Sequence, residues 1–471
     1  MKVYHFLLLL FVSPAISQKR SLVLHHVNVV DMSSGKIRKN MTVVISGNRI
    51  KTIGKKVDRS EGDTIIDARQ KFLIPGLWDM HVHVRNEESI FFPLLIANGI
   101  TGVRDMHNPN RYSSIGKWKD SINIGELTAP RIGAAAGRII DGYGDSRNLG
   151  FVVVKDVEQA RLAVRQMKSY GADFIKIYNR ITEAEYMAIA DEAKNLGMFL
   201  AGHLPYGISL DTVVPLGLRS IEHVDGLTIP FSSNESSIRK LLSDSSASIS
   251  RTRFAKLREL AYQTYDSSLA LEKISLLKKY GVFVCPTLWI TATINLKDFL
   301  LNPEGALLQE VPPPILDKWT LNPLPNFTRA DSVLYFAYYQ RALQLVGLLH
   351  RSGVQIMAGT DSSPVWNYVI PGYSLHFELA LYVKAGMTPY EALKTATVYP
   401  AVFLNRQHDY GDVREGLLAD LVLLKKNPLL DISNTRKIDA VIINGRFLDR
   451  KALDALLQHA IVETTHYKGV K

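Results

Sequence analysis

The chain has 471 residues, of which 46% are hydrophobic and 21% are charged, a balance that excludes fibrous and disordered proteins and fits one large domain with a smaller one. The formal net charge is +11, but the basic residues are scattered without a dense run of Lys and Arg, so no nucleic-acid partner is indicated. Cys285 is the only cysteine, which excludes an intramolecular disulfide.

The N-terminus has the pattern of a signal peptide over residues 1–17. Lys2 precedes the apolar run of residues 6–12, and the small residues Ala15 and Ser17 suit cleavage before Gln18. The apolar run is far shorter than the roughly 20 residues that span a bilayer, which disfavours a membrane anchor. We therefore expect an exported protein, periplasmic or extracellular, without stable membrane insertion after cleavage.

Both ends of the mature chain contain short β-like segments without helices between them. They cover residues 22–24, 27–30, 42–45 and 64–66 near the N-terminus, and 419–424 and 440–445 near the C-terminus. We predict that residues 18–74 and 401–471 combine into one small β-sandwich domain.

The middle of the chain alternates strand-like and helical segments, which predicts parallel βα units. With the strand that carries His81 and His83, eight strands are expected, the others being residues 99–106, 131–136, 173–178, 198–203, 219–223, 282–288 and 354–361. The predicted fold class is therefore α/β: a (β/α)₈ TIM-like barrel over residues 75–400, with inserts near 230–275 and 290–345. An open, doubly wound sheet is the alternative, but it usually has a glycine-rich phosphate turn, which is absent here.

Six side chains with metal-binding chemistry fall at or near predicted strand ends. His81 and His83 are separated by one residue, so a strand would place both on one face. The other four are Lys176, His203, His223 and Asp361. Because reactive groups of such barrels gather at the C-terminal ends of the strands, these six are expected to converge. Imidazole and carboxylate suit Zn²⁺ and similar divalent ions.

Lys176 does not fit such a site as an ordinary ammonium ion, because it would face divalent cations. Three interpretations stay open: the side chain points away, the amine is deprotonated, or the amine is carboxylated. A carbamate would offer two oxygens that can bridge two metals. Two dications would then be balanced by the carbamate, an aspartate and a hydroxide.

These residues lie in sequence blocks that resemble the amidohydrolase superfamily, in its exported imidazolonepropionase-like and prolidase-like branch. The blocks are PGLWDMHVH at 75–83, FIKIY at 174–178, GHLP at 202–205, SIEH at 220–223 and GTD at 359–361. The resemblance covers nearly the whole mature chain. It implies a metal-dependent hydrolase on a (β/α)₈ barrel with a small β-sandwich built from both termini.

The resemblance also implies roles for the six residues. His81, His83 and Asp361 would hold one metal, most simply Zn²⁺, and His203 and His223 the second. Lys176, carboxylated at its Nζ atom, would bridge them. A hydroxide between the metals would attack the substrate, while Asp361 would act as general base and then as general acid.

The expected substrate is a small amide, namely a dipeptide with a C-terminal proline, an N-acyl amino acid or a cyclic amide. Two alternatives stay open. The same site would also suit a lactone or a phosphotriester, since a metal-activated hydroxide attacks any suitable electrophile. An inactive secreted binding module is the other alternative, and a homo-oligomer is also open.

Further residues are candidates for substrate contact. Tyr178 follows Lys176 by two positions and would stabilise an oxyanion or a substrate carboxylate, or else serve as a structural tyrosine. Arg180 and Arg104 would pair with an anionic substrate group, with an internal Arg104–Asp105 ion pair as the alternative.

Two other positions are candidates in the loops. Tyr143 lies in the segment DGYG, where many prolidase-like relatives have GGHG, so substrate preference is expected to differ. His376, after the eighth strand, would face the mouth of the barrel or else lie on a helix surface. Asp79 is expected to orient its neighbours.

Overall fold

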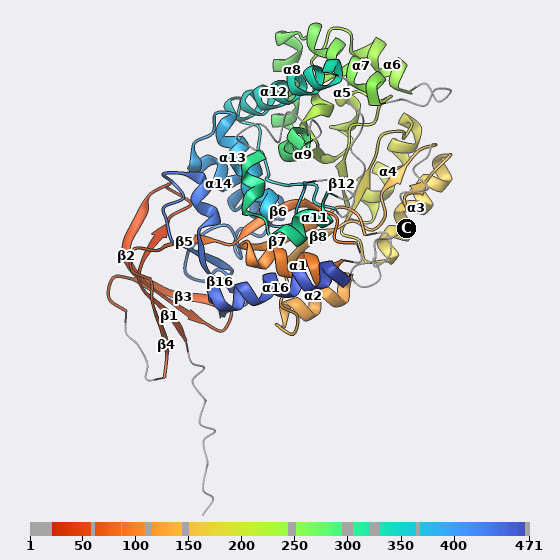
Figure 1. Cartoon of the computed structure of the whole chain (residues 1–471). Helices are drawn as coiled ribbons and strands as arrows, with labels where there is room; N and C mark the ends of the chain where they lie inside the picture. The colour runs from red at the N-terminus through yellow and green to blue at the C-terminus, as the bar shows by residue number, and fades with distance from the viewer. Residues whose placement is uncertain are drawn as a thin grey trace, which may run out of the picture.

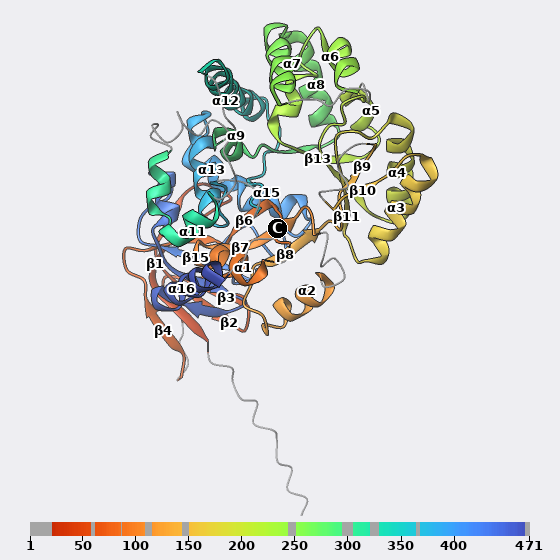
Figure 2. The same ribbon diagram turned by 45° about the vertical axis from the view of Figure 1, so that its right-hand side comes forward.

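The computed structural model describes residues 21–57, 62–85, 87–108, 115–143, 150–243, 251–293, 305–320, 329–363 and 368–466. The expected signal peptide at residues 1–17 lies outside these ranges. Figures 1 and 2 show a β sheet on one side of the molecule and the helices α6, α7 and α8 together on the opposite side.

The two ends of the chain form one eight-stranded sheet, red and blue in Figure 1. Strand β5 pairs with β15 in antiparallel register, with Leu73 opposite Leu423, so the N-terminal and C-terminal segments are hydrogen-bonded neighbours. The strands are β1 (Leu22–Val30), β2 (Ile37–Ser46), β3 (Arg49–Gly54), β4 (Thr64–Asp67), β5 (Phe72–Pro75), β15 (Leu421–Leu424), β16 (Ile438–Ile443) and β17 (Arg446–Leu448).

Side-chain alternation gives this sheet two apolar faces. Leu421 and Leu423 point into a core that belongs to the sheet itself. Val422 and Leu424, the residues between and after them, pack into the large core cluster shared with the barrel. Because successive side chains of a strand point to opposite faces, the run LVLL joins the two parts of the molecule.

Eight parallel segments close into a barrel. Strands β6 (Leu77–Val82), β7 (Ile100–Asp105) and β8 (Arg131–Ala135) form one sheet, and β11 (Phe174–Ile177), β12 (Phe199–Gly202), β13 (Leu218–Glu222) and β14 (Phe283–Cys285) belong to another, which also contains the short β9 (Ile140–Asp141) and β10 (Val152–Val153). Parallel bridges join Ala136 to Phe174, Val284 to Ile356 and Val82 to Ser362, so residues 356–362 are the eighth member. The predicted fold class is confirmed.

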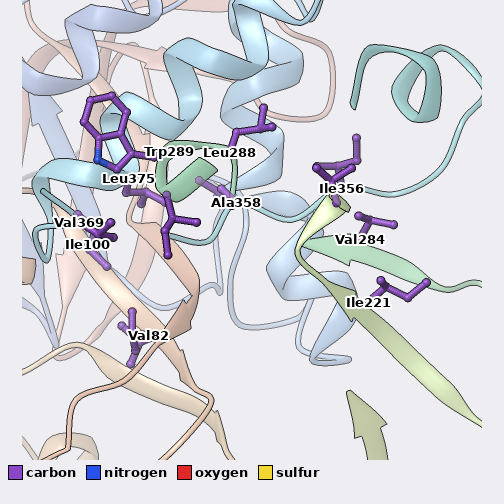
Figure 3. Close-up of a cluster of buried hydrophobic side chains, with 14 of the residues drawn as sticks. Val82, Ile100, Ile221, Val284, Leu288, Trp289, Ile356, Ala358, Val369 and Leu375 are labelled. Carbon is purple, nitrogen blue, oxygen red and sulfur yellow. The ribbon is translucent and has the colours of Figure 1, made fainter. Parts of the chain in front are cut away.

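The barrel has apolar side chains on both faces of its strands. Figure 3 shows Ile221, Val284 and Ile356 beside one another on three adjacent segments, within the large core cluster. Their neighbours Cys285 and Met357 belong instead to a cluster with residues of β6, on the other face of the strands. This alternation directs the side chains at the strand ends toward the barrel axis.

The helices α3 and α4 have capping residues at their starts and glycines after their ends. Asp156 caps α3, Thr182 and Glu185 form a capping box at α4, and Gly171 and Gly197 follow the two helices with φ of +85° and +66°. The α-helices are α1 (Glu88–Ala97), α2 (Ile115–Asn123), α3 (Val157–Ser169), α4 (Glu183–Asn195), α5 (Leu210–Val213), α6 (Glu235–Ser243), α7 (Arg251–Gln263), α8 (Ser267–Lys279), α9 (Leu288–Thr293), α11 (Pro313–Lys318), α12 (Arg329–Arg351), α13 (Tyr373–Lys384), α14 (Pro389–Thr395), α15 (Val398–Phe403) and α16 (Arg450–His466). Three 3₁₀ helices are η3 (Val224–Thr228), η4 (Gly305–Glu310) and η5 (Ile432–Arg436).

The C-terminal segment differs from the prediction that residues 401–471 are β-sandwich. Its residues 450–466 form α16, which packs along α1 beneath the barrel (Figure 1). Leu453, Ala460 and Thr464 are buried at helical spacing, and this periodicity was the signal for the helix. Within the described ranges, no helix has the length and apolar character needed to cross a membrane.

Candidate metal centre

Three of the six predicted ligands come together at the end of the barrel where the strands end. Asp361 Oδ1 lies 2.8 Å from His83 Nε2 and 3.2 Å from His81 Nε2. One ligand atom from each of these three residues lies within 4.8 Å of the others. His81 is completely buried and the other two are nearly so. This arrangement suits a divalent cation.

The histidines continue from this group around the barrel. The ring centroids of His81 and His83 are 5.2 Å apart, those of His81 and His223 4.9 Å, and those of His223 and His203 4.6 Å. His203 and His223 directly follow β12 and β13 and are half-buried. Four imidazoles contributed by three strands therefore form one continuous arc.

Several buried polar atoms in the arc have no hydrogen-bond partner among the described residues. They are His81 Nε2, His83 Nδ1 and Lys176 Nζ. Buried polar atoms in proteins are nearly always hydrogen-bonded, so three exceptions in one cluster call for a ligand or an ion. The donor set, imidazole nitrogen with carboxylate oxygen, fits divalent metal ions such as Zn²⁺.

Burial keeps three histidines of the centre neutral. It lowers the pKa of His83 to about 4 and of His223 to about 3, and holds the pKa of His203 well below its usual value. Burial alone would raise the pKa of Asp361, but the nearby imidazoles of His81 and His83 outweigh it and keep the pKa well below its usual value. Neutral imidazoles and an ionised carboxylate are the protonation states that bind metal.

Lys176 lies inside the barrel with 1% of its surface exposed. Burial lowers the pKa of its amine to about 8, although the negative charges of Glu222 and Asp361 oppose the shift. A larger fraction of this amine than of an ordinary lysine is therefore uncharged near neutral pH, and the uncharged form is the one that reacts with carbon dioxide. The interpretation of Lys176 as pointing away from the site does not agree with this placement.

A second set of residues holds the histidines from behind. Each of these residues is hydrogen-bonded to the Nδ1 atom of one imidazole at 2.8 Å. The pairs are Glu222 Oε2 with His81, Asn179 Oδ1 with His203 and Thr287 Oγ1 with His223. With Nδ1 engaged, Nε2 is left for a metal. The sequence reasoning missed Asn179 and Thr287, although both closely follow strand ends, where such supporting residues gather.

Arg104 contacts neither a substrate site nor Asp105, contrary to both expectations. Its guanidinium lies inside the barrel and donates from Nη2 to Glu222 Oε1 at 2.7 Å and from Nε to the Met80 carbonyl at 2.6 Å. Burial raises the pKa of Glu222, but the charge of Arg104 and the contact with His81 outweigh it and lower the pKa overall. The His81 imidazole is thus hydrogen-bonded to an ionised carboxylate.

Asp79 and Gly359 fix the backbone around Asp361. Asp79 accepts hydrogen bonds from the Thr360 hydroxyl at 2.7 Å, the Thr360 amide at 3.0 Å and the His81 amide at 3.2 Å. A Cβ atom on Gly359 would lie 2.9 Å from the Cβ of His81 and 2.5 Å from Cys285 Sγ. The close approach of two strands at this point therefore requires glycine.

The candidates for substrate contact differ in their burial and in their distance from the predicted ligands. The ring of Tyr178 lies 4.2 Å from that of His203 and is half-buried, which places it at the rim of the centre. Arg180 is half-buried, and its amide donates to Asp141. Tyr143 is 63% exposed. Of these three, Tyr178 has the placement nearest to the metal ligands.

His376 does not reach the centre, which corrects both expectations for it. It is 2% exposed, and its Nδ1 and Nε2 atoms pair with Thr435 Oγ1 and the Asn98 carbonyl, each at 2.9 Å. Asn98 precedes β7, so His376 lies near the opposite end of the barrel from the ligands.

The inserted helices α7 and α12 cover the side of the centre that carries His223. Arg258 of α7 forms an ion pair with Asp225, two residues after His223. The same guanidinium donates to the hydroxyl of Tyr338 on α12 at 2.7 Å and stacks on Phe254. Both inserts are thereby connected to the loop of a predicted ligand.

Comparisons with known proteins agree with this fold. The model of the amidohydrolase family matches residues 332–448. Ochratoxinase from Aspergillus niger is 24% identical over an alignment that covers 86% of this chain and 82% of the relative. A crystal structure of a Xaa-Pro dipeptidase with bound methionine superposes with a TM-score of 0.66 at 23% identity, covering 91% of this chain and all of that one. A bottromycin amidohydrolase reaches 0.69 at 21% identity over 95% of this chain and 91% of its own.

Proposed function

Because residues 332–448 match the model of the amidohydrolase family and ochratoxinase is similar over 86% of the chain, we propose that the protein is a binuclear metal-dependent hydrolase of this family that cleaves carbon–nitrogen amide bonds of a small substrate. The observation that carries the proposal is the convergence of His81, His83 and Asp361 to within 4.8 Å, beside a buried lysine amine without a hydrogen-bond partner among the described residues. A structural cluster would satisfy these atoms, whereas a metal site leaves them free to bind.

Two sets of residues would hold the ions. One ion would be bound by His81, His83 and Asp361, and the other by His203 and His223. Lys176, as its carbamate, would bind both ions. Divalent ions such as Zn²⁺ would supply Lewis acidity, which lowers the pKa of a bound water and polarises a carbonyl. The lowered pKa of Lys176 supports carboxylation, because only the uncharged amine forms a carbamate.

The chain's own residues would move the proton and orient the substrate. Asp361, ionised and nearly buried, would accept a proton from the attacking water at a carboxylate oxygen and return it to the leaving nitrogen. Tyr178 at the rim would donate its hydroxyl proton in a hydrogen bond to the oxyanion or to a substrate carboxylate. Burial raises the pKa of Tyr178, so the hydroxyl keeps its proton at neutral pH.

The substrate class we propose is a dipeptide with a C-terminal proline, an N-acyl amino acid or a cyclic amide. The names of similar proteins support it, since they include a Xaa-Pro dipeptidase and a bottromycin amidohydrolase. Such substrates fit a centre whose rim carries Tyr178, whose hydroxyl would bind a carboxylate. Arg180, two residues further along the chain and half-buried, would add a positive charge.

We also propose that the protein is exported and acts on its small substrate without a nucleic-acid partner or stable membrane insertion. Residues 1–17 support export through their sequence pattern. N-terminal sequencing of protein secreted by the expressing cell is expected to begin at Gln18. Mature protein that retains Met1 would contradict export. Association into a homo-oligomer is compatible with the proposal and is measured by light scattering.

The test of activity is a panel of substrates incubated with zinc-loaded protein. Release of free amine from Xaa-Pro dipeptides, N-acyl amino acids or cyclic amides is expected, and Asp361→Asn should abolish it. Asp120→Asn, on an exposed position of α2, is the matched control and should keep it. Turnover of only a lactone or a phosphotriester would contradict the bond class, and two bound metals without turnover of any compound would favour a binding module.

A further inference from the structure

Thr287 has a backbone conformation that its residue type disfavours. Its φ is +50°, and a β-branched residue in the left-handed region is a genuine outlier. The side chain is completely buried. Because such strain persists only where the surrounding structure enforces it, and often at functional sites, the conformation calls for a reason.

The conformation delivers the Thr287 hydroxyl to a predicted metal ligand. Thr287 Oγ1 lies 2.8 Å from Nδ1 of His223. The same segment holds the backbone of His223, whose amide donates to the Cys285 carbonyl at 2.9 Å, while the next amide, of Val224, donates to the Pro286 carbonyl at 3.2 Å. Residues 285–287 thus fix both the main chain and the ring of His223.

The buried carboxyl group of a residue on a distant helix holds this segment in place. Glu378 of α13 is completely buried and accepts the amides of Leu288 at 2.8 Å and Trp289 at 2.6 Å, the first two residues of α9. Trp289 donates in turn to the Tyr368 carbonyl at 2.7 Å. Figure 3 shows Leu288 and Trp289 in the same core as Leu375 of α13.

We infer that Thr287 and Glu378 are positioning residues that preset the ring of His223 for a metal ion. Glu378 anchors the start of α9, the anchored helix forces Thr287 into the left-handed region, and Thr287 then holds Nδ1 so that Nε2 points to the metal. The inference rests on the proposed function, because it assumes that His223 binds metal, but it adds two residues that touch neither metal nor substrate.

The strain itself is tested on metal-free protein with the pair Thr287→Ala and Thr287→Gly. Both variants lose the hydroxyl and the methyl group, but only glycine relieves the positive φ. Glycine ordinarily destabilises relative to alanine, whereas here we expect the glycine variant to melt at the higher temperature. A lower melting temperature for the glycine variant would overturn the strained arrangement.

The positioning role is tested by zinc uptake of full-length protein dialysed against buffered free zinc. Thr287→Val should bind the second zinc about 10- to 100-fold more weakly than wild type, whereas Thr287→Ser, which keeps the hydroxyl, should bind it as tightly as wild type. Glu378→Gln, which replaces one acceptor oxygen by a donor, should also bind the second zinc more weakly. A melting curve of this variant serves as the control that it is folded. Thr293→Val removes a buried hydroxyl of α9 that donates to the Ile290 carbonyl, and it should leave zinc uptake unchanged.

The outcomes separate the inference from the proposed function. Wild-type protein that takes up no zinc would overturn the proposed function and this inference with it. Wild-type protein with two zinc ions, together with Thr287→Val that binds both equally tightly, would overturn only the inference.

Discussion

Lys176 is a buried lysine whose amine has a pKa below its usual value. Replacing it with alanine removes the amine that we assign to both metals. We expect metal content to fall from about two ions per chain to one or none, with loss of hydrolysis. Elemental analysis of Lys176→Ala checks this, and retention of two metals with full activity would rule out the carbamate.

His376 gives a prediction for stability against pH. Burial lowers its pKa to about 4 from 6.5, so between these values the unfolded chain binds a proton that the folded protein does not. Protonation of His376 in the unfolded chain therefore lowers the free energy of unfolding as the pH falls from 6.5 to 4. When the pH is lowered from 7 to 4.5, the free energy of unfolding of wild type should fall by on the order of 2 kcal/mol more than that of His376→Gln, as measured by urea unfolding. Equal losses in the two proteins would contradict the buried neutral ring.

At the scale of residues, the sequence identified the three side chains that converge but not the residues that support them. His81, His83 and Asp361 could be predicted because each ends a strand, and position along a strand is a local property. Glu222, Arg104 and Thr287 act through contacts between strands that are far apart in the sequence, which no local pattern encodes. His376 was misjudged for the same reason, since its partners Asn98 and Thr435 lie on other elements.

At the scale of elements, Gly359 sets how closely the eighth segment approaches β6. A methyl group there would press on the Cβ of His81, so Gly359→Ala should cost about 1–3 kcal/mol of stability and weaken metal binding. Chemical unfolding and zinc titration measure both effects. Gly116→Ala in α2 is the control, because a Cβ there meets nothing within 4 Å and alanine favours a helix. A Gly359→Ala protein as stable as wild type would show that the strands are not closely packed.

The alternation of strand and helix along the chain was sufficient to predict the eight barrel members. The eighth is the least regular, since it is joined to its neighbours by single bridges at Ile356 and Ser362. Its assignment as a barrel member nevertheless followed from the apolar run that ends at Asp361. The helix α16 was missed because its apolar residues are spaced over a polar segment, and the helix is stabilised by packing on α1.

At the scale of the whole molecule, α16 ties the C-terminus to the barrel. Leu453 is completely buried in the common core, so Leu453→Ala should lower the free energy of unfolding by about 2–5 kcal/mol. Leu430→Ala, at a position 81% exposed, is the control and should change it little. Because α16 lies beneath the barrel, folded Leu453→Ala should keep its metal content. A change below 1 kcal/mol would mean that α16 is not part of the folded core.

The whole molecule is organised around the strand ends: the terminal sheet and α16 pack below the barrel, while the inserts α7 and α12 connect to the loop after β13. The central claim is that this arrangement serves a binuclear metal centre. Its most direct test is the metal content per chain of protein expressed with added zinc and bicarbonate. The account predicts about two ions in wild type and fewer in Lys176→Ala. Wild-type protein without stoichiometric metal would contradict it.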